Sequence, residues 1–156
     1  MPAIKINFIT YLLVFLTTSI AQAQIVKVID GDTIHLDGEK IRFSGIDAPE
    51  MKQTCFKDGQ ETMCGNAARD LIQNKIGNLQ VECVREGKDQ YQRTLAECFV
   101  MGESLSQYLV RQGYAFAYRQ YSKKFIPDED FARENSMGMW DMTFDFPWDF
   151  RKTKSN

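Results

Sequence analysis

Within residues 30–50, three of the six acidic residues and the one arginine form the most constraining feature of the sequence, on two neighbouring segments of strand-forming sequence. The first segment carries Asp32, and the second carries Arg42, Asp47 and Glu50. Carboxylates that a fold gathers together repel one another and lose hydration, so such a fold needs a cation to offset their charge. The neighbouring arginine indicates that the partner of this cation is a phosphate, which guanidinium groups bind through paired hydrogen bonds.

The first 23 residues have the three parts of a secretory signal peptide. Lys5 gives a basic start, residues 6–20 are mostly apolar, and residues 21–23 form a small-x-small cleavage site. A retained membrane anchor is the alternative, but the apolar run is shorter than the roughly 20 residues that span a bilayer. We therefore expect a signal peptide at 1–23, a secreted or periplasmic protein, and no stable membrane association after cleavage.

The mature chain is expected to form one domain over 24–151, followed by a frayed tail at 152–156. Because Lys5 is the only charged residue in the signal peptide, the 19 basic and 21 acidic residues become 18 and 21, a formal charge of −3. This charge excludes a polycation that coats nucleic acid nonspecifically. Binding to a polyanion must then depend on a local group of basic residues. We expect a monomer.

The four cysteines of an exported chain are expected to form disulfides, because none has the paired C-x-x-C spacing of a zinc site. Four cysteines permit three pairings. We favour Cys55 with Cys64, which bracket a short loop, and Cys83 with Cys98, which lie on two segments that resemble hairpin partners.

The strand pattern begins at residue 25 and is punctuated by turn signals such as Asp37-Gly38. We predict strands over 25–29, 33–36, 39–46, 79–85 and 94–101, with a polar loop over 86–93. Helices are predicted over 66–75, from the Ser104 cap to Gly113, and from Pro127 to Gly138. This order predicts an α+β fold, a five-stranded Greek-key β-barrel of the oligonucleotide-binding (OB) type with about three α-helices.

Four segments together resemble the staphylococcal nuclease (thermonuclease) family. They are V-I-D-G-D-T at 28–33, I-R-F-S-G-I-D-A-P-E at 41–50, D-Q-Y-Q-R-T-L-A at 89–96 and L-V-R-Q-G at 109–113. Each segment alone is ordinary, since Asp-Gly-Asp usually forms only a turn and a strand arginine usually makes a surface ion pair. Their conjunction in the family's order carries the resemblance.

The resemblance implies a role for each matching residue. Asp32 and Asp47 match side chains that ligate Ca²⁺, and Ala48 matches a residue that ligates through its backbone carbonyl. Glu50 matches the glutamate that positions or deprotonates the attacking water. The two arginines that bind the scissile phosphate correspond to Arg42 and Arg93.

Aromatic residues complete the set of expected substrate contacts. By resemblance, Tyr91 lines the nucleotide pocket. Residues 114–124 mix aromatic and basic side chains, as a surface that stacks bases beside a phosphate track would. Within them we expect Tyr118 and Tyr121 to contact substrate and Phe116 to lie in the core.

The sequence therefore predicts an exported, Ca²⁺-dependent nuclease that acts on DNA and RNA with low sequence specificity. The resemblance implies products with 3′-phosphate ends. Two alternatives remain open. One is a non-catalytic OB-fold module that binds nucleic acid, and the other is a periplasmic interaction protein whose acidic cluster binds stabilising calcium.

Overall fold

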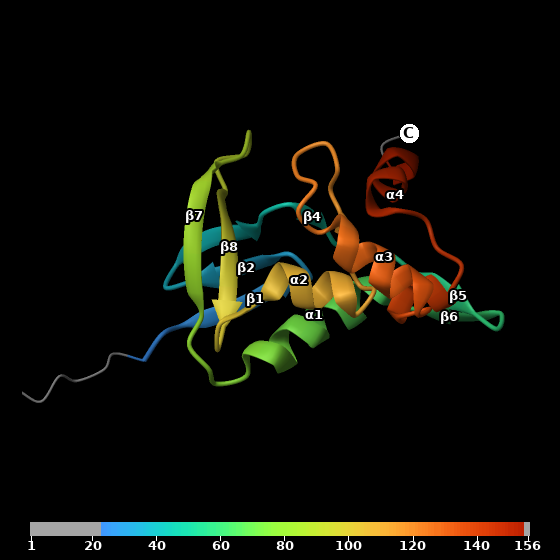
Figure 1. Ribbon diagram of the computed structural model, residues 1–156, viewed down its shortest axis with the longest axis horizontal. Coiled ribbons are helices and arrows are strands. Elements are labelled where there is room, and N and C mark those ends of the chain that lie inside the picture. Colours follow the sequence, from blue (N-terminus) through green and yellow to red (C-terminus); the bar gives the residue numbers. More distant parts are fainter. Residues whose placement is uncertain (1–22, 155–156) are drawn as a thin grey trace, which may run out of the picture.

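The computed structural model describes residues 23–154 (Figure 1). The signal peptide was predicted at residues 1–23, so all of it except residue 23 lies outside the described range. Between residues 23 and 154, none of the helices is both long and apolar enough to cross a bilayer.

The main sheet contains the five strands that the sequence predicted, in the order β1-β2-β3-β8-β7, with a short sixth strand, β9, beside β8. The strands are β1 (Val26–Asp30), β2 (Thr33–Leu36), β3 (Glu39–Phe43), β7 (Glu82–Lys88), β8 (Thr94–Val100) and β9 (Glu103–Ser104). Strands β3 and β8 pair in parallel, and the other pairs are antiparallel. The α+β class is confirmed, but within residues 23–154 the pairings leave β1 and β7 as edges, so backbone pairing does not close the predicted barrel.

The predicted hairpin turn joins β2 to β3. Asp37 and Gly38 both have positive φ, at 50° and 88°, as a two-residue turn that follows the twist of the strands requires. Asp37 also accepts a 2.8 Å hydrogen bond from the backbone N–H of Ile25. This turn fixes the register that sets Thr33 opposite Arg42.

Two predicted strands differ by more than one residue from those observed. The strand expected over 39–46 breaks at Ser44, whose backbone N–H bonds Ala96, and the chain continues as β4 (Ile46–Asp47), which pairs with β10 (Phe116–Ala117). The strand expected at 79–85 begins three residues later, because the backbone N–H of Leu79 still bonds the last turn of the preceding helix.

Four α-helices occur in the described part of the chain, where about three were predicted. They are α1 (Cys64–Ile76), α2 (Leu105–Arg111), α3 (Ile126–Glu134) and α4 (Pro147–Lys154). The Ser104 cap is confirmed, since its side chain accepts a hydrogen bond from Gln107 N–H. Gly138 does not end α3 but begins a 3-10 helix, η1 (Gly138–Asp141). Helix α4 was not predicted, and it continues through Lys154 into the segment expected to fray.

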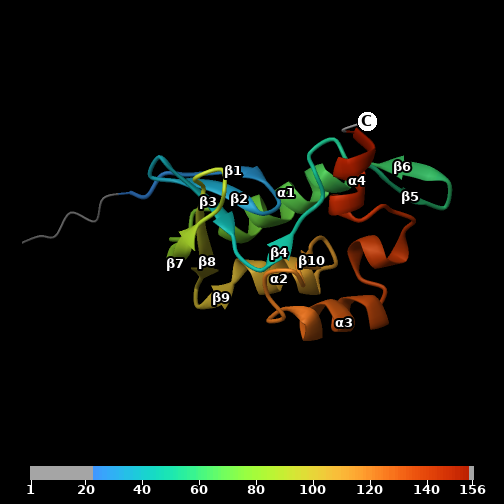
Figure 2. The same ribbon diagram turned by 90° about the horizontal axis from the view of Figure 1, so that it is seen from above.

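Two hydrophobic clusters hold these elements together. The larger lies between the sheet and helices α1 and α2, and its fully buried side chains include Ile34, Ile41, Phe43, Ile72, Leu105 and Leu109. The smaller surrounds Phe116 and Met139 with the aromatic rings of Trp140, Phe144, Phe146 and Trp148. In Figure 2 the main sheet lies at one end, and α4 lies toward the other beside the hairpin of β5 (Cys55–Lys57) and β6 (Gln60–Thr62). The aromatic cluster therefore attaches the carboxy-terminal helix to the body of the protein.

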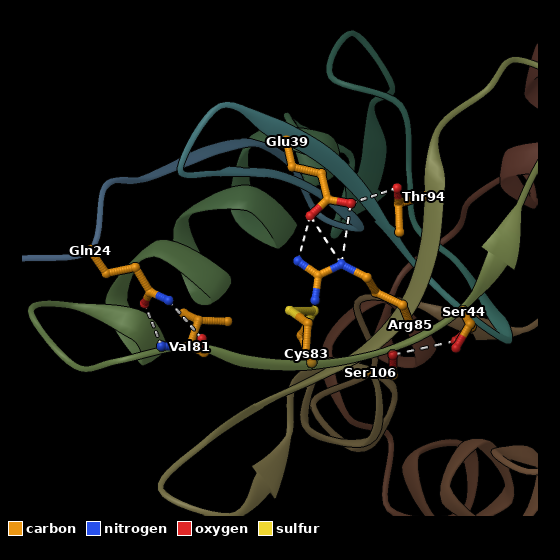
Figure 3. Close-up of a disulfide and its surroundings, with 9 residues drawn as sticks. Gln24, Glu39, Ser44, Val81, Cys83, Arg85, Thr94 and Ser106 are labelled. Atoms are coloured by element: carbon orange, nitrogen blue, oxygen red, sulfur yellow. Dashed lines mark hydrogen bonds and ion pairs between the residues drawn. A yellow bond between two sulfur atoms is a disulfide. The ribbon is translucent and has the colours of Figure 1, made fainter.

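Both favoured disulfides are present, Cys55–Cys64 and Cys83–Cys98. Cys83 and Cys98 are directly opposed in the register of β7 and β8. Figure 3 shows this disulfide near Glu39, which pairs with Arg85 and accepts a 2.8 Å hydrogen bond from the hydroxyl of Thr94. Side chains thus join β3, β7 and β8 in addition to the backbone ladder.

Candidate functional site

A cleft of about 1030 Å³ lies where the main sheet, the segment after β4 and helix α4 meet. Every site residue that the sequence predicted lines this cleft: Asp32, Arg42, Asp47, Ala48, Glu50, Tyr91, Arg93, Tyr118 and Tyr121. The fold therefore brings together residues from several separate segments of the chain.

The turn between β1 and β2 supplies Asp32 at the buried end of the cleft. A Cβ atom on Gly31 would lie only 2.8 Å from Ala48 Cβ and 2.9 Å from Ala68 Cβ, so glycine lets this turn pack directly on both. Asp32 Oδ2 accepts a 2.9 Å hydrogen bond from the backbone N–H of Ala48. Its Oδ1 accepts a 3.2 Å hydrogen bond from the hydroxyl of Thr33.

Arg42 bridges the two buried aspartates. Its position on β3, opposite Thr33, sets it beside Asp32, with which it forms an ion pair. Its Nη2 also lies 3.0 Å from Asp47 Oδ1. Burial opposes the charge of Arg42, but the two carboxylates outweigh burial and raise its pKa above the ordinary value.

Burial disfavours the charged form of two carboxylates in this part of the cleft. Asp47 is 0% exposed. Burial raises its pKa despite a hydrogen bond from Arg151, and the charge of Asp32 raises it further. Burial and the charge of Asp32 also raise the pKa of Asp30 to about 6. A cation bound here would favour the charged form of both carboxylates.

The donor chemistry of these residues suits calcium, which prefers carboxylate and backbone carbonyl oxygens. Asp32 and Asp47 offer the carboxylates, and Ala48 offers a backbone carbonyl. In residues 23–154, however, no group of three or more histidine, cysteine or acidic side chains is arranged to hold a metal. Arginines contact the oxygens of both aspartates, so an ion would share or displace those contacts.

Arg151 enters the cleft from α4 and was not predicted as a site residue. Its Nη2 lies 2.7 Å from Asp47 Oδ2, and its Nη1 lies 2.8 Å from Glu50 Oε1. Glu50 is thereby held beside Asp47, with 43% of its side chain exposed. These contacts span 104 and 101 residues, and no local sequence pattern indicates a pairing over that distance.

The loop between β7 and β8 presents Arg93 to the cleft. Asp89 organises this loop by accepting hydrogen bonds from the backbone N–H groups of Tyr91 and Arg93 and a 2.6 Å bond from Arg93 Nε. Partial burial opposes ionisation of Asp89, but these bonds lower its pKa. Arg93 is therefore paired with Asp89, not with the aspartates around Arg42.

Aromatic rings line the rim of the cleft. Tyr91 is 71% exposed, and its ring centroid lies 5.5 Å from Arg93 Cζ. Tyr118 meets Tyr121 edge to face at 4.8 Å and lies parallel to Trp148 at 6.2 Å. Exposed ring faces beside basic groups are suited to stacking planar bases without regard to sequence.

Comparison with known proteins gives one family and several relatives. The family described as staphylococcal nuclease homologue matches residues 40–142. An uncharacterized endonuclease of Haemophilus influenzae is 32% identical over 148 residues, covering 87% of this chain and 78% of that protein. Succinoglycan biosynthesis protein ExoI of Rhizobium meliloti is 29% identical over 118 residues, covering 73% of this chain and 62% of that protein. Endonuclease YhcR of Bacillus subtilis is 30% identical over 146 residues, covering 80% of this chain and 12% of that protein.

Proposed function

Because this chain belongs to the staphylococcal nuclease homologue family, we propose that it is an exported, Ca²⁺-dependent nuclease that hydrolyses DNA and RNA with low sequence specificity. The observation that carries the proposal is a single cleft lined by groups suited to bind a cation, bind a phosphate and activate water. Two of the relatives are named as endonucleases, which supports the same class of activity.

In this proposal Asp32, Asp47 and the backbone carbonyl of Ala48 hold the calcium ion. Their hard oxygen atoms support this assignment, as does the burial of Asp47, whose charged form a bound cation would favour. When bound, the ion supplies positive charge that polarises a phosphate oxygen and a water molecule.

The side chains of the cleft bind the phosphate and activate the water. Arg42 and Arg93 donate hydrogen bonds to the non-bridging phosphate oxygens, where such preorganised donors are each worth about 3 kcal/mol in the transition state. Glu50 orients the attacking water and accepts its proton. The bond between phosphorus and the 5′ oxygen breaks, and that oxygen takes a proton from solvent. The products are a 3′-phosphate and a 5′-hydroxyl.

Substrate binding in this proposal relies on backbone charge and base stacking. Tyr91, Tyr118 and Tyr121 offer ring faces that any base can stack on, which fits low sequence specificity. A backbone that enters a narrow cleft must also bend, and a paired duplex resists bending. We therefore expect faster cleavage of denatured DNA than of native DNA.

Export and a monomeric state complete the proposal. All four cysteines are paired, and disulfides persist in oxidising compartments such as the periplasm and the exterior of the cell. A secreted or periplasmic location fits this use of cysteine. The proposal also includes a monomer that has no stable membrane association after the signal peptide is cleaved.

The test is cleavage of labelled DNA and RNA oligonucleotides by the purified protein with calcium, magnesium, manganese or a chelator. We expect calcium-stimulated cleavage of both substrates, 3′-phosphate ends, and loss of cleavage in the chelator. Binding that survives the chelator without any cleavage would favour the nucleic-acid-binding module. A protein that calcium stabilises, but that neither binds nor cuts nucleic acid, would favour the interaction protein.

A further inference from the structure

Arg151 reaches the centre of the cleft from the carboxy-terminal helix. Its Nη1 and Nη2 contact both carboxylate oxygens of Asp47, at 3.2 and 2.7 Å, and Nη1 also contacts Glu50 at 2.8 Å. Its side chain is 39% exposed and lines the same cleft as Arg42 and Arg93. The cleft is therefore lined by a third guanidinium group, in contact with the proposed ligand Asp47 and the proposed base Glu50.

Aromatic packing fixes the helix that carries Arg151. Trp148 stacks on Phe146, with centroids 4.6 Å apart and planes 7° apart, and lies 6.1 Å from the fully buried Phe116. Figure 2 shows α4 beside the loop that follows β4. The backbone of α4 is thus anchored, while the long side chain of Arg151 retains rotatable bonds.

The contacts of Arg151 conflict with a metal ion on Asp47. A divalent ion needs the same carboxylate oxygens that the guanidinium now contacts, and two cations on one carboxylate repel each other. An ion on Asp47 would therefore displace at least part of the Arg151 contacts. Its planar fork suits a phosphate oxygen pair as well as a carboxylate, and the phosphate of a bound substrate would lie in the same cleft.

We propose that Arg151 is a third phosphate-binding arginine of the site. In the ion-free protein it neutralises Asp47 and Glu50, and when a divalent ion binds it yields Asp47 and donates to the substrate phosphate. This inference rests on the proposed function, because it assigns Asp47 to the ion and the cleft to a phosphodiester.

The first test measures calcium binding by titration calorimetry with calcium alone. We expect Arg151→Gln to bind calcium about tenfold more tightly than the wild type, because no guanidinium has to be displaced. Arg151→Lys should fall between them. The matched control is Lys152→Gln, which removes the same charge from the next residue of α4. Lys152 pairs with Asp149 rather than with a residue of the cleft. The calcium affinity of Lys152→Gln should equal that of the wild type.

The second test measures cleavage of single-stranded DNA at saturating calcium. Arg151→Gln should raise KM about tenfold, and it should lower the slope of log KM against log salt by about one, as loss of one phosphate contact does. Arg151→Lys should restore most of the salt slope. A merely structural role for Arg151 would not lower the slope of log KM against log salt. Thermal unfolding of each variant checks that it folds.

The outcomes separate this proposal from the proposed function. Equal or weaker calcium binding by Arg151→Gln, or the same gain in Lys152→Gln, would overturn the competition with the ion. An unchanged KM and salt slope would overturn the phosphate contact. A wild-type protein that binds calcium but cleaves no nucleic acid would instead refute the nuclease, while the calcium titrations would still decide whether Arg151 competes with the ion.

Discussion

The backbone N–H of Ala48 donates a 2.9 Å hydrogen bond to Asp32, across 16 residues of chain. This bond joins the β1–β2 turn to the segment that follows β4. It leaves the second oxygen of Asp32 to Arg42 and to the hydroxyl of Thr33. The charge of Asp32 is thus held at a fixed place in the cleft, and that place can be tested by substitution.

Asp32→Asn should weaken calcium binding at least about tenfold and reduce cleavage with it. An amide oxygen still accepts a hydrogen bond from Ala48, so the fold should persist, but the negative charge that attracts the ion is lost. Calcium titration and circular dichroism measure the two effects. The control is Asp37→Asn, which removes the same charge from the exposed hairpin turn. Unchanged calcium affinity in Asp32→Asn would remove Asp32 from the proposed ligands.

Arg93→Ala should lower kcat/KM by a factor of about 10² to 10³, because a preorganised donor to the phosphate is removed. Arg93→Lys should recover only part of this loss, since lysine keeps the charge but lacks the planar fork. Steady-state kinetics on a short DNA substrate gives both values. Arg69→Ala, which removes an arginine that pairs with Asp70 on α1, serves as control. Wild-type kinetics in Arg93→Ala would contradict the assignment.

Replacing either pair of disulfide cysteines by alanine should lower the free energy of unfolding by about 3 kcal/mol. The two losses should be similar, because the bridged residues lie 9 and 15 positions apart and the entropic effect grows only with the logarithm of loop length. Urea unfolding followed by tryptophan fluorescence measures both variants. A loss well below 1 kcal/mol for either pair would show that its loop is already restricted in the unfolded chain.

Glu39→Gln should reduce stability slightly at pH 7, and this difference should disappear over the pH range that leads below the folded-state pKa of Glu39. Hydrogen bonds from Arg85 and Thr94 lower the pKa of Glu39. A carboxyl whose pKa is lower in the folded state stabilises the protein above its ordinary pKa, and this contribution is lost as the pH falls through the folded value. The effect stays small because the pair is exposed and screened by solvent.

Thermal unfolding of Glu39→Gln and the wild type across this pH range supplies the measurement. The difference between their Tm values should shrink steadily as the pH falls. A difference that widens toward low pH would mean that Glu39 has no stabilising partner in the folded protein.

Local sequence patterns predicted much of the fold. Strand β2 was predicted at its exact bounds, and the Asp37-Gly38 turn and the Ser104 cap were also correct. These features depend on residues close together in the chain, so their propensities are visible in a short window. The split of the third predicted strand at Ser44 was missed, because β4 leaves its neighbour only to pair with β10, about 70 residues further on.

The sequence by itself indicated most of the residues to which we assign the chemistry of the cleft. Asp32, Arg42, Asp47 and Glu50 belong to one short region, and their types and order indicate a cation and a phosphate without any coordinates. Only the tertiary structure decided that Arg151 joins them, and that Phe116 and Trp148 hold α4 in place for it. Contacts across more than 100 residues arise from packing of the complete chain, and packing leaves no periodic trace in the sequence around either partner.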